Sequence, residues 1–281
     1  MYEYTYRGKN GERAPITTTS IKIASSVDRI ERRAFSRCTF VKKIDIPSNV
    51  HAIGEGTFAG CTSLSDIHIP SSVHTIGYEC FTDCSSLTSI QIPSSIHTLE
   101  YSIFAECEFL RHIELPSSLH TIETTAFFGC SSLTTINIPS SVTKIGASAF
   151  YECASLVSIA LPPSINVIGK YTFYKCASLN YVYIPPSAKS IEQFSFYGCE
   201  SLKHVYVNKN CNIHKRAFID SITVIRSSWY ELKPFILLRQ LIINERASIR
   251  SHEDEGISNI IQTFITCSND DIFRIILDYI A

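Results

Sequence analysis

Cysteine and histidine are the residues of this chain whose number and spacing could support metal binding or redox chemistry. The 281 residues include 11 cysteines and 9 histidines. Zinc sites need closely spaced Cys and His pairs such as C-x-x-C, and the sequence has none. Most of the cysteines instead recur every 23 residues, which sets neighbouring side chains parallel and suits disulfide geometry poorly. We therefore interpret this column as reduced, buried thiols: Cys38, Cys61, Cys84, Cys107, Cys130, Cys153, Cys176 and Cys199.

Four of the histidines follow the same spacing, at His51, His74, His97 and His120. Stacked repeats would align them as a ladder, and a metal-binding or pH-sensing stripe is one interpretation. The other is that repeat duplication copied a surface residue. No carboxylate column lies beside them to orient the rings as metal ligands. We favour duplication and predict neither a metal nor a cofactor.

Catalytic, nucleic-acid-binding and membrane functions each lack their sequence signals. There is no G-x-S-x-G, no glycine-rich phosphate loop, no H-E-x-x-H and no dinucleotide fingerprint. Lys and Arg number 25 against 26 Asp and Glu, so no overall positive field favours nucleic acid. No apolar run reaches the roughly 18 residues of a membrane span, and the first residues do not resemble a signal peptide. We predict a non-enzyme without nucleic-acid or membrane partners, located in the cytoplasm.

The elements that position these residues are copies of one 23-residue unit. Its consensus reads C-x-S-L-x-x-I-x-I-P-S-S-V-x-x-I-G-x-x-A-F-x-x. The alternation in I-x-I predicts a strand that the proline ends, and V-x-x-I sends two more apolar side chains inward. Glycine at 54, 77, 146 and 169 is expected to permit a sharp corner. The spacing in A-F-x-x-C is compatible with one short helical turn.

This unit resembles the repeat of the BspA-like leucine-rich repeat family, over about nine turns in residues 21–218. The resemblance implies an α/β solenoid: a right-handed horseshoe with a concave parallel β-sheet and short helical turns on the convex side. It also implies use as a binding scaffold. Bacterial members are often surface adhesins. The opening Tyr2–Arg7, Pro15 and a degenerate first repeat are most similar to the intracellular type of unicellular eukaryotes.

Two segments are expected to cap the solenoid. Residues 1–20 form the N-terminal cap, in which Tyr2, Tyr4 and Tyr6 alternate as in a strand. Residues 219–281 form a small helical C-terminal cap, with helices predicted near 234–245, 257–267 and 270–279. A bundle that docks a partner is the alternative for these helices. The arginines of the first repeat either form a patch that docks an anionic partner or are a solvated end of the solenoid.

The outward positions of the predicted sheet vary most and could carry binding specificity. Early turns present charged and polar residues, including His112 and Glu114, whereas the last turns bring four aromatic and imidazole side chains together. Such a cluster has the composition of an interface hot spot, although aromatic residues also favour strands. We predict a monomeric protein-binding scaffold; an adhesin-like surface or secreted protein and a structural spacer are the alternatives. The cluster consists of Tyr181, Tyr183, His204 and Tyr206.

Overall fold

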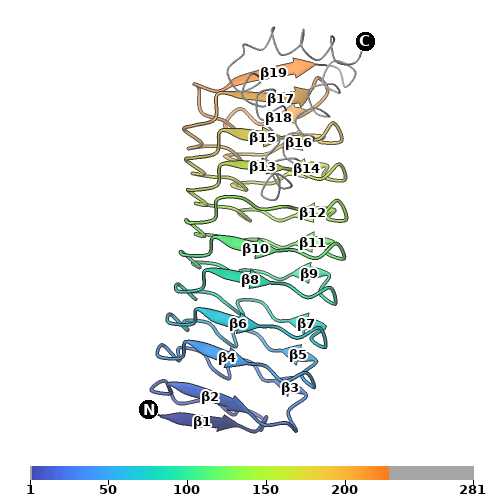
Figure 1. Cartoon of the computed structure of the whole chain (residues 1–281). Helices are drawn as coiled ribbons and strands as arrows, with labels where there is room; N and C mark the ends of the chain where they lie inside the picture. The colour runs from blue at the N-terminus through green and yellow to red at the C-terminus, as the bar shows by residue number, and fades with distance from the viewer. Residues whose placement is uncertain (1, 228–281) are drawn as a thin grey trace, which may run out of the picture. The chain divides into compact units, whose positions relative to one another are not determined.

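The chain winds into a stack of coils whose short strands line up in two rows, which we call the first and the second sheet (Figure 1). Within each row, hydrogen-bonded ladders join the strands in groups of two or three. The computed structural model describes residues 2–227. Residues 1–225 form one compact unit. Strands in successive coils pair 23 residues apart, as Ile44 does with Ile67. The parallel β-solenoid predicted from the repeat is therefore confirmed.

The first sheet contains the strands predicted from the I-x-I motif. In each three-residue strand the central side chain is buried and its neighbours face outward. The proline that follows ends the strand because it lacks an N–H donor. Thr135 takes part in the same sheet through a single bridge to Ser158. The strands are β2 (Ser20–Ile23), β4 (Lys43–Asp45), β6 (Asp66–His68), β8 (Ser89–Gln91), β10 (His112–Glu114), β13 (Ser158–Ala160), β15 (Tyr181–Tyr183) and β17 (His204–Asn208).

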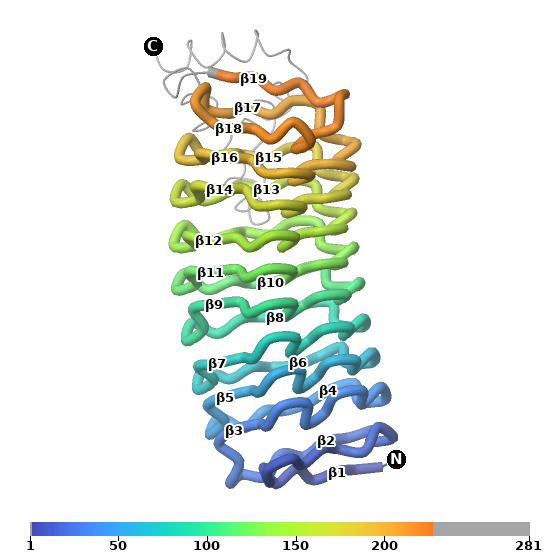
Figure 2. Tube along the Cα trace, turned by 180° about the vertical axis from the view of Figure 1, so that it is seen from behind, coloured from blue at the N-terminus to red at the C-terminus, as the bar shows by residue number. Residues whose placement is uncertain are grey.

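A second sheet runs beside the first and was not anticipated from the sequence (Figure 2). It arises from the V-x-x-I motif, whose apolar residues Val50 and Ile53 are buried as predicted. Only two residues per coil have strand geometry there, too few for an alternating pattern to be visible. Its strands are β3 (Arg29–Ile30), β5 (Ala52–Ile53), β7 (Thr75–Ile76), β9 (Thr98–Leu99), β11 (Thr121–Ile122), β12 (Lys144–Ile145), β14 (Val167–Ile168), β16 (Ser190–Ile191) and β18 (Asn212–Ile213).

The phenylalanine column forms the centre of the core. Each of its rings from Phe35 to Phe196 is fully buried. Successive rings stack at centroid distances such as 5.4 Å between Phe81 and Phe104. Removing one such ring from water stabilises the fold by roughly 1.5–3 kcal/mol. No single coil can bury its ring alone, so stability depends on stacking.

The segment that closes each coil contains no helix, so the predicted short helical turns are wrong. In the first coil the N–H of Phe35 donates to the carbonyl of Thr57 in the next coil, at 3.0 Å. The N–H of Cys38 instead donates within its own coil, to Phe35 at 3.1 Å. Alternation between local and inter-coil bonds cannot build the i→i−4 ladder of a helix. Positive φ angles at Arg33 (56°) and Arg37 (62°) also break helical geometry. We call this side of the stack the turn face.

Three of the four repeated glycines, Gly54, Gly77 and Gly146, permit close packing between coils, and none of the four provides the sharp corner expected for them. None of Gly54, Gly77, Gly146 and Gly169 has a positive φ. A Cβ atom on Gly54 would lie 2.6 Å from the backbone nitrogen of Arg32 in the preceding coil. The role therefore depends on the absence of a side chain rather than on unusual dihedral angles.

Tyr6 ends the core at the N-terminal side. It belongs to β1 (Glu3–Tyr6), which pairs in parallel with β2. Its buried ring meets Phe35 edge-on at 5.0 Å, and its hydroxyl accepts the N–H of Glu31 at 2.9 Å. The strand-like alternation predicted for this segment therefore corresponds to an observed strand.

Residues 219–227, the start of the expected helical cap, contain a strand instead. This strand, β19 (Thr223–Ser227), pairs with β17 and lengthens the first sheet. The other residues of the expected cap, 228–281, lie outside the described residues, as do the three predicted helices.

Candidate binding surfaces

The outward side of the first sheet is charged in the early coils. Lys43 lies 3.3 Å from Asp66 and 3.8 Å from Asp45. These carboxylates raise the pKa of Lys43, Asp66 more than Asp45. His112 and Glu114 lie 3.6 Å apart on β10. All these side chains are well exposed, so the pairs add little stability and stay available to a partner.

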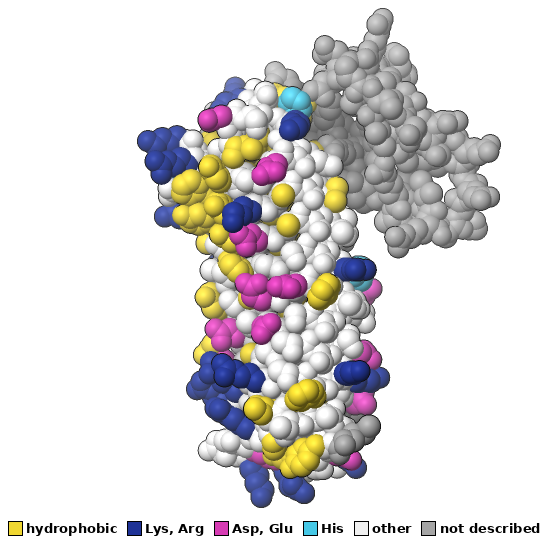
Figure 3. Space-filling view, turned by 90° about the vertical axis from the view of Figure 1, so that its left-hand side faces the viewer, with side chains coloured by type: hydrophobic (Ala, Val, Ile, Leu, Met, Phe, Trp, Pro, Cys, Tyr) yellow, Lys and Arg dark blue, Asp and Glu magenta, His cyan; other side chains and the backbone are white. Residues whose placement is uncertain are grey.

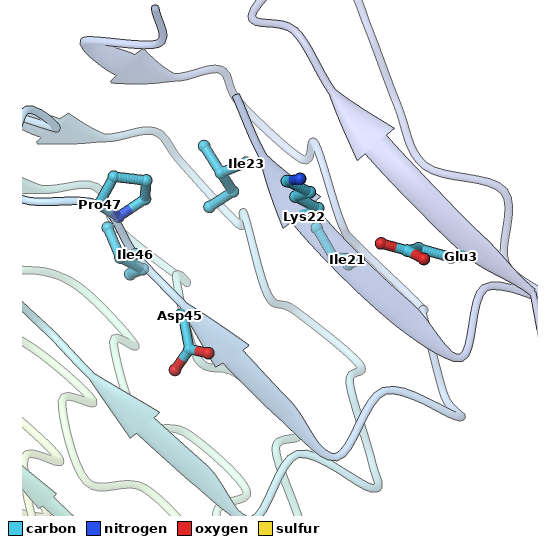
Figure 4. A pocket seen from close by; sticks show the side chains of 7 residues that line it. All are labelled: Glu3, Ile21, Lys22, Ile23, Asp45, Ile46 and Pro47. Carbon is cyan, nitrogen blue, oxygen red and sulfur yellow. The ribbon is translucent and has the colours of Figure 1, made fainter. Parts of the chain in front are cut away.

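A groove of about 370 Å³ opens in this charged region, between β2 and β4 (Figure 4). The two strands belong to separate hydrogen-bonded ladders. Lys22 is on β2, and the strands on either side of β2 carry Glu3 and Asp45. Cationic and anionic side chains therefore alternate across the groove. Its lining residues are Glu3, Ile21, Lys22, Ile23, Asp45, Ile46 and Pro47. Sequence reasoning did not find this groove, because it depends on the spacing between strands.

The structure places Tyr181, Tyr183, His204 and Tyr206 on one face of the neighbouring strands β15 and β17. We call these four residues the tyrosine patch. The three tyrosines are partly exposed and His204 is exposed. Burial raises the pKa of Tyr183 to about 12. His112 and Glu114 lie three coils earlier on the same face and do not join the patch. Binding by any of these residues stays a prediction.

The histidine ladder divides into two pairs. Ring centroids are 6.0 Å apart for His51 and His74, and 5.8 Å apart for His97 and His120. The Nδ1 atoms of His51 and His74 both contact the carbonyl oxygen of Ser72. Among residues 2–227 no group of three or more His, Cys, Asp or Glu side chains could hold a metal ion.

The ten described cysteines are all buried. Burial raises the pKa of each column thiol, to about 11 at Cys38 and about 12 at Cys107. A thiolate is the reactive form of cysteine, so these groups are poor nucleophiles and poor metal ligands. Their arrangement agrees with the interpretation as reduced core residues. Cys267 lies outside the described residues.

An aromatic surface on the turn face was missed from the sequence. Phe128, Tyr151, Tyr174 and Tyr197 stack in consecutive coils, with Tyr171 and Phe194 beside them. The signal was present, because each of the four directly follows a core phenylalanine. The view of this side shows hydrophobic side chains gathered in the later coils, next to Lys and Arg, with Asp and Glu below them (Figure 3).

Three features define a β-solenoid of the leucine-rich repeat type: two parallel sheets that run side by side, a buried phenylalanine column and a 23-residue coil. The sequence matches the BspA type leucine rich repeat region, with six copies, over residues 14–132 and 101–225. The chain belongs to this family. No curated protein matches the sequence. In the described part of the chain, no helix has the length and apolar character needed to cross a membrane.

Solved structures with a similar fold come from bacteria. A leucine-rich repeat protein of Bacteroides ovatus is 28% identical with a TM-score of 0.64, and the match covers 80% of this chain and 66% of that one. A leucine-rich cell surface protein of Faecalibacterium prausnitzii is 22% identical with a TM-score of 0.49, over 81% of this chain and 83% of that one. The first similarity supports the fold, and the chain spans slightly less than two thirds of that relative.

Proposed function

We propose that this protein is a non-catalytic, monomeric scaffold that binds another protein through the outward face of its first sheet. The supporting observation is the contrast between the two sides of each strand. Inward positions keep the same apolar residue types from coil to coil, because the core requires them. Outward positions change at every coil: Asp45 is followed by His68, Gln91 and Glu114 at equivalent positions. A rigid frame with variable outward side chains suits recognition of a specific partner.

The tyrosine patch is the part of this face that we assign to the interface. Tyrosine supplies a large apolar ring and a polar hydroxyl, and the side chain loses little conformational freedom on binding. Three such rings lie on the neighbouring strands β15 and β17 of a rigid stack. Interface energy is concentrated in clusters of this kind, and the surrounding contacts exclude water.

A cytoplasmic location is part of the proposal. Its support is chemical: nine free, buried thiols between Cys38 and Cys199 suit a compartment that keeps cysteines reduced. Fractionation of cells, with an antibody against the native protein, tests this part. Recovery of the protein at the cell surface or in the medium would contradict the location and favour the adhesin-like alternative.

Affinity capture from the native cell, read by mass spectrometry, tests the interface. The wild type is compared with a variant carrying Ala at Tyr181, Tyr183, His204 and Tyr206. A matched control carries Ala at Lys43, Asp45, Asp66 and His68, four outward residues of the same sheet. Circular dichroism and thermal unfolding first establish that both variants are folded.

A protein that the wild type and the control capture, and the tyrosine-patch variant does not, is the expected result. Equal capture by all three proteins would remove the tyrosine patch from the interface. Absence of any specific partner would contradict the scaffold function and favour a structural spacer.

A further inference from the structure

Four aromatic side chains form a row along the turn face of the later coils. Ring centroids are 4.7 Å apart from Phe128 to Tyr151, 4.7 Å from Tyr151 to Tyr174 and 5.9 Å from Tyr174 to Tyr197. The earlier coils place small residues at this position, such as Ala105. Because those coils stack equally well, the fold does not require the rings. We call these four residues the aromatic row.

Tyr171 and Phe194 widen the row into a ridged surface. They stack on each other at 5.3 Å, and each meets a ring of the row edge-on: Tyr171 with Tyr174 at 5.6 Å, and Phe194 with Tyr197 at 5.4 Å. Both residues have positive φ angles, 58° and 59°. A bulky residue is uncommon in that conformation, and an earlier coil has Gly56 there. Local backbone preference therefore does not explain these rings.

Glu106 lies beside the start of the row, and Asp83 and Glu108 lie close enough to Glu106 for their charges to raise its pKa. A Cβ atom placed on Gly129, the residue after Phe128, would lie 2.6 Å from Oε2 of Glu106. The Glu106 carboxylate thus lies directly against the backbone that carries the first ring. We call these three residues the acidic group.

The acidic group has no cationic partner within residues 2–227. Two other carboxylates of the turn face are paired: Glu55 contacts Arg32 at 3.2 Å, and Glu152 contacts Lys175 at 2.8 Å. Burial raises the pKa of Glu106, and the charge of Glu108 raises it further. The carboxylates next to the aromatic row are therefore complementary to a cation supplied from outside.

The charge order along the turn face argues against a second copy as the occupant. Arginines lie at the early end, at Arg32, Arg33 and Arg37; the acidic group lies in the middle and the aromatic row at the later end. If two copies of the chain paired their turn faces antiparallel about the middle, their acidic groups would lie against each other. If they paired in parallel, like charges would lie together along the whole face. Both arrangements are repulsive.

We propose that the aromatic row and the acidic group together bind an extended proline-rich segment of a partner protein, with Arg or Lys at one end of that segment. A polyproline II helix repeats every three residues with a rise of about 3.1 Å each, so equivalent residues are about 9 Å apart. Rings two coils apart are separated by about 9–10 Å. Tyrosine hydroxyls can donate to the carbonyl groups of such a segment, whose prolines lack N–H donors of their own. The basic residues pair with Asp83, Glu106 and Glu108.

This surface lies on the turn face and is separate from the tyrosine patch of the first sheet. A partner could therefore bind here whether or not the proposed interface on the first sheet is used.

Fluorescence anisotropy with a labelled synthetic peptide tests the proposal. The probe has three arginines followed by three Pro-Pro-Leu triplets, and a second probe carries the two blocks in reverse order. At least one of them should bind the wild type saturably, and more weakly as salt is raised. Asp83→Asn, Glu106→Gln and Glu108→Gln combined should weaken binding about tenfold or more, as should Tyr151→Ser with Tyr174→Ser.

Matched controls carry equivalent changes on the first sheet: Asp66→Asn with Glu114→Gln, and Tyr181→Ser with Tyr183→Ser. All variants are checked for native thermal unfolding before binding is measured. The controls should bind the probe as the wild type does. Any one of three results would overturn the proposal. These are no saturable binding to the wild type, equal binding of a probe with glutamates in place of arginines, and an equal loss of binding in the controls. The capture experiment on the tyrosine patch can fail or succeed independently of this one.

Discussion

The Sγ atom of Cys61 donates a hydrogen bond to the carbonyl oxygen of Phe35 in the preceding coil, at 3.1 Å. The same carbonyl also accepts the N–H of Cys38 within its own coil. One backbone oxygen is thereby satisfied by two cysteines, one through its backbone and one through its thiol. The bond between thiol and carbonyl recurs at 3.1–3.2 Å in the following coils, at Cys84, Cys107, Cys130, Cys153, Cys176 and Cys199. Cysteine combines small size, apolar packing and a weak donor, and this combination fits the position.

Native-state thiol labelling should therefore be slow. Iodoacetamide at pH 8 should leave the ten described cysteines unmodified in the folded protein and should modify them in urea. All ten are buried, and burial also raises the pKa of the nine thiols from Cys38 to Cys199. Peptide mapping by mass spectrometry reads each site separately. Rapid labelling of Cys107 or Cys130 in the folded protein would contradict the buried thiol column.

The repeated glycines provide a matched pair of substitutions. A Cβ atom at Gly146 would lie 2.3 Å from the backbone nitrogen of Thr124, whereas the nearest atom at Gly169 is a Thr172 side-chain oxygen at 3.4 Å. Gly146→Ala should therefore lower the free energy of unfolding by about 2 kcal/mol or more, since backbone must move. Gly169→Ala should change it by less than about 1 kcal/mol. Urea denaturation at a fixed pH measures both, and similar losses in the two variants would contradict the close approach of coils at Gly146.

The N-terminal segment should lose stability in acid through Glu12. Burial raises the pKa of this carboxylate, but the N–H groups of Lys9 and Arg7 and the Tyr4 hydroxyl outweigh that effect and leave the pKa below its ordinary value. The carboxylate consequently stabilises the folded state above its unfolded pKa of about 4.3, and the contribution disappears as pH falls through the lower folded value.

Glu12→Gln should reduce the free energy of unfolding by about 1 kcal/mol at pH 7. The loss should be smaller at pH 3, below the unfolded pKa, where protonation begins to remove the contribution of the wild-type carboxylate. Urea denaturation and amide exchange of β1 at both pH values measure this change. Glu200→Gln, at an exposed residue without an ion pair in the described part of the chain, serves as the control. An equal loss at pH 3 and pH 7 would show that the charge of Glu12 does not matter.

Much of the fold could be predicted because the repeat is regular. Ile44 and Ile67 were expected to face inward from strands, and both are buried in paired strands. The helical turns were mispredicted because the spacing of Phe35 and Cys38 fits one helical turn as well as it fits the observed tandem turns. Local spacing does not reveal that the N–H of Phe35 bonds to another coil. The arrangement of Tyr181, Tyr183, His204 and Tyr206 on one face followed from the repeat period, whereas the groove between β2 and β4 did not.

The sequence by itself determined the period of the coil, the residues of the core and the outward columns of the first sheet, because burial imposes the same residue types on every copy. Tertiary structure decided what depends on distances between coils. It separated the histidine ladder into pairs, directed the column thiols from Cys61 to Cys199 to a carbonyl 26 residues earlier and gave Gly54, Gly77 and Gly146 their packing role. It also placed Glu106 against the backbone beside Phe128. This division arises because the repeat specifies which residues stack. Hydrogen bonds and contacts between coils specify how closely those residues approach and which groups remain unpaired.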